Sequence, residues 1–203
     1  KLAYVGLDHD MGKLSVGRQS HPFADNIGGK TSIFNVYGGS SDWNYGSRSS
    51  NSMKYSTTQS GLTLDTIGIV NGSSTNTNAF DEFEVTISTK LFGSDVSVGY
   101  ADDVNSDISY WGVAGSTDLG PLTVSSSYTI YDAATDKYGL EATASYSIFS
   151  VGYGDKEGTG VAYTAGVSHD LNESLSVYAE GEMKDLDSGS DTTSWSIGSK
   201  FTF

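Results

Sequence analysis

The last nine residues of the chain read Trp195-Ser196-Ile197-Gly198-Ser199-Lys200-Phe201-Thr202-Phe203. Hydrophobic residues stand at every second position but one, and small or polar residues fill the gaps. Because successive side chains of a β-strand point to opposite faces, this alternation predicts a strand with one apolar and one polar face. The same pattern recurs at Phe83–Ile87, Val96–Tyr100 and Leu140–Ile148. Along the whole chain we count about thirteen such strands, each of roughly 8–12 residues.

The composition agrees with an all-β protein and narrows its class. The 203 residues include 25 Gly, 13 Tyr and only 2 Pro, which suits strands that are joined by turns. The chain contains no cysteine, so it has no disulfide framework. No stretch approaches the roughly 18–20 apolar residues of a membrane helix. The formal net charge of -14 argues against a nucleic-acid partner, because phosphate contacts need clustered Lys and Arg.

The expected connections between strands alternate between short turns and longer polar loops. Barrels of the outer membrane have this arrangement, with short turns on one side and long loops on the other. We therefore predict an antiparallel transmembrane β-barrel that forms a single domain over residues 1–203, and a soluble sandwich or solenoid is the alternative. The longest connection, Pro22–Ser50, is too long for a simple hairpin loop.

The sequence offers no constellation of residues that would support catalysis. His9, His21 and His169 are scattered without metal-ligand spacing, so we predict no metal site. The serines do not occur in the Gly-x-Ser-x-Gly pattern of a nucleophile elbow. We expect no enzymatic activity and no cofactor, although enzymes built on barrels do exist.

Two stretches carry a resemblance to a known family. Lys1–Leu7 followed by Gly12–Gln19 resembles the hairpin before the long third loop in general porins of Gram-negative outer membranes. The terminal strand that ends in Phe203 is similar to the signal read by the barrel-assembly machinery. The resemblance implies a homotrimer of sixteen-stranded barrels, of which this chain would supply strands four to sixteen. It also implies contact with membrane lipid and lipopolysaccharide, and a C-terminus on the periplasmic side.

In the porin family the long third loop folds into the barrel and narrows it, and its acids face a ladder of bases. The resemblance therefore implies an inward-folding constriction loop at 22–50. Asp25 and Asp42 are the acid candidates, although the usual Glu of the family motif is missing from this loop. Lys1 and Arg48 match positions of the basic ladder, with ordinary surface charge as the alternative.

The alternation of side chains gives a second view of which bases face the lumen. If Met53 and Tyr55 face lipid, then Lys54 and Arg48 face inward. If Leu2 and Tyr4 face lipid, then Lys1 also faces inward. Arg18 has the parity of the lipid face, but it stands at a strand end from which it could bend inward at the start of the loop. We include Arg18 among the constriction candidates, with an interfacial position as the alternative.

Four acids fall on the inward parity and predict an acidic lumen wall: Glu84, Glu141, Glu180 and Glu182. Glu180 and Glu182 could form a catalytic carboxylate pair, but a solvated wall that attracts cations is the better interpretation. Taken with the resemblance, these features imply a water-filled channel for passive diffusion of small hydrophilic solutes and ions, with a preference for cations. The alternatives are an adhesion or binding barrel, a solute-specific porin, and a soluble secreted β-protein.

Overall fold

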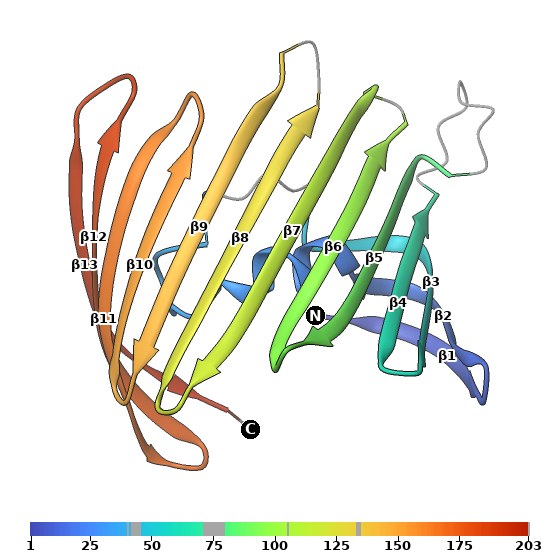
Figure 1. The fold of residues 1–203 in the computed structure, drawn as a ribbon, viewed down its shortest axis with the longest axis horizontal. Helices are drawn as coiled ribbons and strands as arrows, with labels where there is room; N and C mark the ends of the chain where they lie inside the picture. Colours follow the sequence, from blue (N-terminus) through green and yellow to red (C-terminus); the bar gives the residue numbers. More distant parts are fainter. Residues whose placement is uncertain (40, 42–45, 71–79, 105, 133–134, 203) are drawn as a thin grey trace.

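A computed structural model describes residues 1–39, 41, 46–70, 80–104, 106–132 and 135–202. Thirteen strands form one antiparallel sheet in which each strand pairs with its neighbours in the sequence, so the order is β1 to β13 (Figure 1). The strands are β1 (Ala3–His9), β2 (Gly12–Ser20), β3 (Arg48–Gln59), β4 (Leu62–Ile69), β5 (Glu82–Leu91), β6 (Ser94–Asp103), β7 (Ile108–Leu119), β8 (Leu122–Asp132), β9 (Lys137–Tyr146), β10 (Phe149–Lys156), β11 (Gly160–Asn172), β12 (Leu175–Leu186) and β13 (Thr192–Phe201). The predicted fold class and the predicted number of strands are confirmed.

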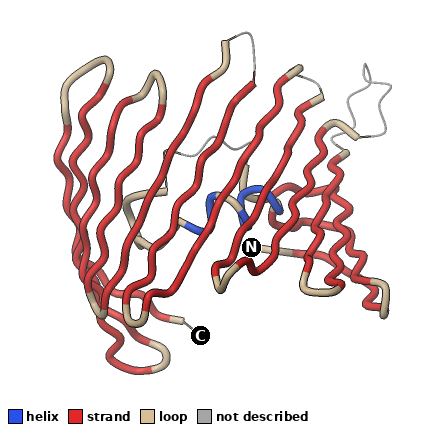
Figure 2. Tube along the Cα trace, in the orientation of Figure 1, coloured by secondary structure: helices blue, strands red, loops and turns tan. Residues whose placement is uncertain are grey.

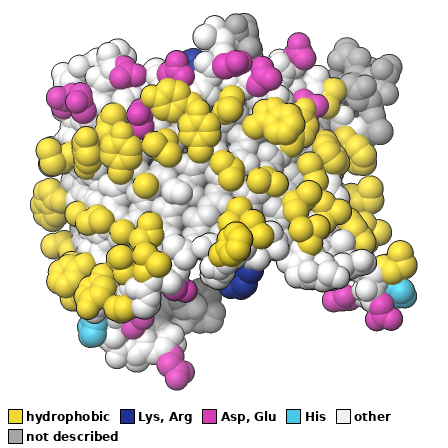
Figure 3. All heavy atoms as spheres, viewed as in Figure 1, with side chains coloured by type: hydrophobic (Ala, Val, Ile, Leu, Met, Phe, Trp, Pro, Cys, Tyr) yellow, Lys and Arg dark blue, Asp and Glu magenta, His cyan; other side chains and the backbone are white. Residues whose placement is uncertain are grey.

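The sheet curves strongly, and the register of its strands assigns every side chain to one of two faces. Directly opposed residues of neighbouring strands lie on the same face. Val16 is opposite both Val5 and Met53, and these three side chains belong to the outer, convex face. Large apolar side chains cover much of that face (Figure 3). Their exposure to the outside is the reverse of a water-soluble fold and is typical of a barrel surrounded by lipid.

The described residues of the connection between β2 and β3 (21–39, 41, 46 and 47) run along the concave side of the sheet, which we call the inner face (Figure 2). They include the helix α1 (Pro22–Asn26) and the 3-10 helix η1 (Gly28–Lys30). Because β3 begins at Arg48, this connection ends slightly before the predicted loop boundary at Ser50. In the part of the chain that the structure describes, no helix is long and apolar enough to span a membrane.

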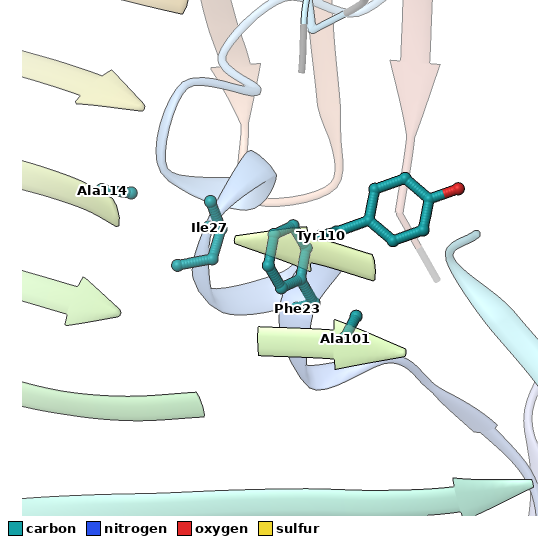
Figure 4. Packing of buried hydrophobic residues seen from close by; sticks show 5 residues of the cluster. All are labelled: Phe23, Ile27, Ala101, Tyr110 and Ala114. Atoms are coloured by element: carbon teal, nitrogen blue, oxygen red, sulfur yellow. The ribbon is translucent and has the colours of Figure 1, made fainter. Parts of the chain in front are cut away.

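An apolar cluster fixes α1 to the inner face of the sheet (Figure 4). Phe23 and Ile27 are fully buried against Ala101, Ala114 and Tyr110 of β6 and β7. The wall is flat at this point because Gly99 and Gly112 carry no side chain on the inner face. A Cβ atom built at Gly112 would lie 2.8 Å from the side chain of Phe23 and 2.8 Å from that of Ile27. The small residues of β6 and β7 therefore form a shelf that allows the helix to approach the sheet closely.

This shelf generates a prediction about Gly112→Val. The new side chain would displace Phe23 and Ile27, and overpacking of this kind costs about 1–3 kcal/mol. We expect the barrel to remain folded while residues 21–41 become more accessible to added protease. Gly115→Val is the matched control, since a Cβ there meets nothing closer than 3.5 Å. Equal proteolysis of the two variants would contradict the role assigned to the shelf.

Candidate functional site

The inner segment, which we define as residues 21–39 and 41, begins at a buried pair on the wall. His21 Nδ1 lies 2.6 Å from Oε1 of Glu84, and its Nε2 lies 2.8 Å from the hydroxyl of Ser49. The second carboxylate oxygen of Glu84 accepts the backbone N–H of Phe23 at 3.0 Å. His21 and Glu84 are both essentially inaccessible to solvent. Glu84 thus fixes the first turn of the inner segment to β5.

Two further glutamates hold the middle and the distal part of the segment. Glu141 on β9 accepts hydrogen bonds from the Thr31 hydroxyl and the Ser41 backbone N–H, each at 2.7 Å. Glu180 on β12 accepts the backbone N–H groups of Asn35 at 2.6 Å and Val36 at 2.8 Å. The Asn35 side chain and the Tyr37 N–H add two longer bonds to the same carboxylate. Charge-assisted bonds of this kind are roughly twice as strong as neutral ones.

Glu182 is the one of these four glutamates that pairs with a lysine. Its Oε1 lies 3.0 Å from Nζ of Lys184 on the same strand, and its Oε2 accepts the Gly38 N–H at 3.3 Å. The contacts of these four glutamates extend from β5 to β12, so the inner segment follows the wall around much of the sheet. Without them, the backbone N–H groups of the segment would need other partners.

The four glutamates lie on the inner face, as their parity predicts, but they are not a solvated wall. Their exposed fractions are 2% for Glu84, 3% for Glu141, and 6% for Glu180 and Glu182. The sequence pattern could not reveal this burial, because the covering residues lie 61 to 145 positions away along the chain. The structure also gives no support to a catalytic role for Glu180 and Glu182, since their oxygens accept backbone N–H groups. No three His, Cys, Asp or Glu residues in the described ranges are grouped so as to hold a metal ion.

The structure brings together two of the predicted constriction residues, Lys54 and Asp25. Lys54 Nζ lies 3.9 Å from Oδ2 of Asp25 and donates to the backbone oxygen of Ser20 at 3.3 Å. The Lys54 side chain is 19% exposed and that of Asp25 is 50% exposed. An ion pair this open to water is weak. Asp25 therefore stays half exposed to the enclosed space, while Lys54 is mostly covered.

The structure contradicts the prediction that Leu2 and Tyr4 face outward and Lys1 faces inward. Both faces of β1 carry apolar residues, and the sequence alone does not say which face is outward. The register shows that Val5 and Leu7 face outward, opposite Val16 and Leu14. Leu2 and Tyr4 instead line a cavity on the inner face. Lys1 precedes β1, is exposed, and has the parity of the outer face if the strand is continued to it.

A bulge changes the expected place of Arg48, whereas Arg18 keeps the outward direction that its parity predicts. The register between β2 and β3 shifts between Gly17 and Gln19, and Asn51 has φ 55 on the opposite strand. After this shift Ser49 takes the inward position beside His21, so Arg48 no longer shares the parity of Lys54. Arg18 lies opposite Ala3 on the outer face and donates to the Ser50 hydroxyl at 3.2 Å. Asp42, the second acid candidate, lies outside the described residues.

The inner cavity beside β1 is lined by charged residues that the sequence interpretation did not include among the site candidates. It has a volume of about 210 Å³ and is lined by Lys13, Lys54 and Asp65 together with serine hydroxyls. The ammonium of Lys13 lies 5.5 Å from the centre of the Tyr4 ring. Asn26 donates to Asp65 at 3.1 Å, which joins α1 to β4. The apolar alternation on β2 assigns Lys13 to the inner face, and this signal was present in the sequence.

A single antiparallel sheet with an apolar convex face and a polar concave face defines the class of outer-membrane β-barrels. Solved structures of this class are similar to the chain over nearly its whole length. They include OmpF of Salmonella typhi in complex with daunomycin (TM-score 0.81, 16% identity, 100% of this chain and 78% of that one). A loop L8 deletion mutant of OmpT of Vibrio cholerae gives a TM-score of 0.78 at 17% identity, with 98% of this chain and 78% of that one covered. The trimer form of OmpT, also of Vibrio cholerae, gives 0.76 at 17% identity, with coverages of 98% and 80%.

The family comparison identifies the protein family, which the similarity of fold alone does not. The model of the Gram-negative porin family matches residues 1–199. The chain therefore belongs to the Gram-negative porins, which are proteins of the outer membrane. Comparison with curated proteins gives no match.

The bonds to Glu180 predict that Glu180→Gln loosens the distal part of the inner segment. The substitution removes the charge and turns an N–H donor toward backbone donors, so we expect a local loss of about 2–3 kcal/mol. Hydrogen exchange should accelerate at Asn35–Tyr37 and change less at Asp25. Glu173→Gln, at an exposed turn, is the control with the same chemical change. Unchanged protection of Asn35–Tyr37 would show that Glu180 does not hold the segment.

Proposed function

We propose that this porin forms a water-filled channel for passive diffusion of small hydrophilic solutes and ions, in which the connection at 22–50 is the constriction loop. The inner segment carries the proposal. Its backbone is bound to buried carboxylates from β5 to β12, so it occupies part of the space that the curved sheet encloses. A loop fixed inside a barrel narrows the path for solutes, and its charges sort ions by sign. The proposed channel needs no cofactor and performs no chemistry.

Single-channel recording in a planar bilayer, with protein purified from native membranes, tests this function. We expect stable ohmic steps, and we expect larger steps from Gly112→Val and Glu180→Gln because both variants release the inner segment from the wall. Well-folded protein that gives no steps would exclude the channel. Channels of unchanged conductance in both variants would keep the channel but remove the inner segment as its constriction.

We also propose that the channel prefers cations. The chain carries a net charge of -14, and Glu141 and Glu180 accept hydrogen bonds from neutral donors. Such bonds do not cancel a negative charge, and its field extends further through a low-dielectric wall than through water. Lys54 opposes this preference, because it is the base that stands beside Asp25.

The selectivity proposal predicts opposite effects for two substitutions. Lys54→Glu should raise the cation-to-anion permeability ratio and Asp25→Asn should lower it, each by about twofold because salt screens exposed charges. The reversal potential under a salt gradient measures both changes. Lys90→Gln, whose side chain is 73% exposed near a turn, is the control. An anion preference in the unmodified protein would overturn the charge argument and leave the channel in place.

We propose a homotrimer of closed sixteen-stranded barrels as the complete assembly, with the C-terminus of the chain on the periplasmic side. The trimer form of OmpT supports the oligomer. In the sheet described here β1 and β13 each pair with one neighbour, and open edges cannot face lipid. Additional strands would satisfy these edges. Lipopolysaccharide and other membrane lipids would then surround the apolar outer face.

An adhesion or binding barrel is the second candidate, and acidic side chains at one end of the sheet favour it (Figure 3). In that case a partner would bind to this end and the lumen would be incidental. A solute-specific porin would show current block that saturates with solute concentration. The recordings described above distinguish all three functions.

A further inference from the structure

The inner cavity beside β1 has one apolar side and one polar side. Leu2 and Tyr4 form the apolar side, and each of these side chains is about half exposed. Lys13, Lys54 and Asp65 stand on the polar side together with serine hydroxyls. The volume of about 210 Å³ corresponds to about seven waters at roughly 30 Å³ each. The cavity therefore admits a solute of about the size of one amino acid.

The register of β2, β3 and β4 places charges of both signs around this polar side. Lys13, Ser56 and Asp65 oppose one another and form one lateral row. Since neighbouring strands are about 4.8 Å apart, the backbones of Lys13 and Asp65 are roughly 10 Å apart. Lys54 lies two residues before Ser56 on β3, which makes it a diagonal neighbour of both Lys13 and Asp65. A solute in the cavity thus meets bases and an acid at the same time.

Lys13 is the base of the cavity that is left for a ligand. The ion pairs among the described residues do not include Lys13, although Asp8 is directly opposite on β1. The Lys13 ammonium instead lies 5.5 Å from the centre of the Tyr4 ring, and such a contact is weak at an exposed site. Lys54, by contrast, has Asp25 and a backbone oxygen as partners. An anionic group that enters the cavity therefore finds three N–H donors on Lys13.

Asp65 is the matching acid, because its hydrogen-bond donors are neutral. Its Oδ2 accepts the Asn26 side chain at 3.1 Å, and its Oδ1 accepts the hydroxyl of Ser56. Each carboxylate oxygen has two lone-pair directions, so both oxygens can accept a further donor. The Asp65 side chain is half-buried, and no ion pair joins it to Lys13 in the described structure. A compact solute with one charge of each sign can therefore bridge the two residues.

We propose that this cavity binds an α-amino acid with an apolar side chain, as the zwitterion. The carboxylate accepts hydrogen bonds from Lys13, the ammonium donates to Asp65, and the side chain packs on Leu2 and Tyr4. A solute with a single charge would be attracted by one of the two charged residues and repelled by the other. The proposal rests on the channel function, because solutes reach the inner face through the lumen, and it assigns a substrate class to that channel. A weak site admits the solute and also releases it.

Saturation-transfer NMR with the full-length purified protein in detergent tests the proposal, because this measurement of binding does not depend on conduction. The probes are leucine, 4-methylpentanoate, which lacks the ammonium, and 3-methylbutylamine, which lacks the carboxylate. The three probes have the same branched apolar end. We expect leucine to bind about threefold more tightly than either analogue, which is the effect of one exposed charge pair.

Variants of the cavity assign each charge of the solute to its partner. Lys13→Gln should remove the advantage of leucine over 3-methylbutylamine, and Asp65→Asn should remove its advantage over 4-methylpentanoate. Leu2→Ser should weaken the binding of all three probes. Lys90→Gln is the matched control for Lys13→Gln, since Lys90 pairs with Asp95 and does not line this cavity. It should leave the order of the three probes unchanged.

The same measurements can overturn the proposal. Tighter binding of 4-methylpentanoate than of leucine would make the cavity an anion site, and tighter binding of 3-methylbutylamine would make it a cation site. An equal loss of all three probes in Asp65→Asn would show that this aspartate acts only through its bond to Asn26 of α1. Ohmic steps in a planar bilayer without any binding of leucine would remove the site and keep the channel. Binding of leucine without steps would remove the channel and keep the site.

Discussion

The backbone hydrogen bonds between consecutive antiparallel strands determine everything else in this structure. They fix the register, and the register decides which side chains meet the outside and which meet the enclosed space. A shift by one residue would exchange the two faces of a strand. The bulge between β2 and β3 shows this at small scale, because it moves Ser49 into the inward position and removes Arg48 from it.

The inner glutamates accept hydrogen bonds from backbone N–H groups of the inner segment. A segment without regular structure for most of its length leaves backbone N–H groups that need partners. Here the wall supplies carboxylates, each with two oxygens that accept several donors at once. The apolar contact of Phe23 and Ile27 with β6 and β7 adds a second and independent attachment. Polar and apolar contacts thus hold different parts of the same segment.

The fold could be predicted from the sequence because the alternation of apolar and polar residues along a strand is a local property. Thirteen strands, their antiparallel order and the long connection after Ser20 could all be read from neighbouring residues. The inward direction of Lys54 and of the glutamates also followed from parity. The burial of Glu84 and Glu180 could not be predicted, because the residues that cover them are far away in the sequence.

Two other errors had equally physical causes. β1 has apolar residues on both faces, so its sequence does not show whether Tyr4 or Val5 faces outward. The pairing with β2 shows that Val5 does. The place of Arg48 depends on one residue, Asn51, whose positive φ belongs to an irregularity that no alternation rule contains. Local patterns fail where a strand is ambiguous or where a ladder is interrupted.

The attachment of the inner segment has a consequence for the order in which the protein folds. The Asn35 backbone reaches a partner that is synthesised 145 residues later, whereas each hairpin closes between neighbours in the chain. Contacts of long sequence separation form slowly, because a large loop must close before they contribute. The part of the inner segment around Asn35 can therefore dock only after β12 has been synthesised, whereas α1 needs only β5 to β7. Until that moment the distal part of the inner segment is not yet fixed to the wall.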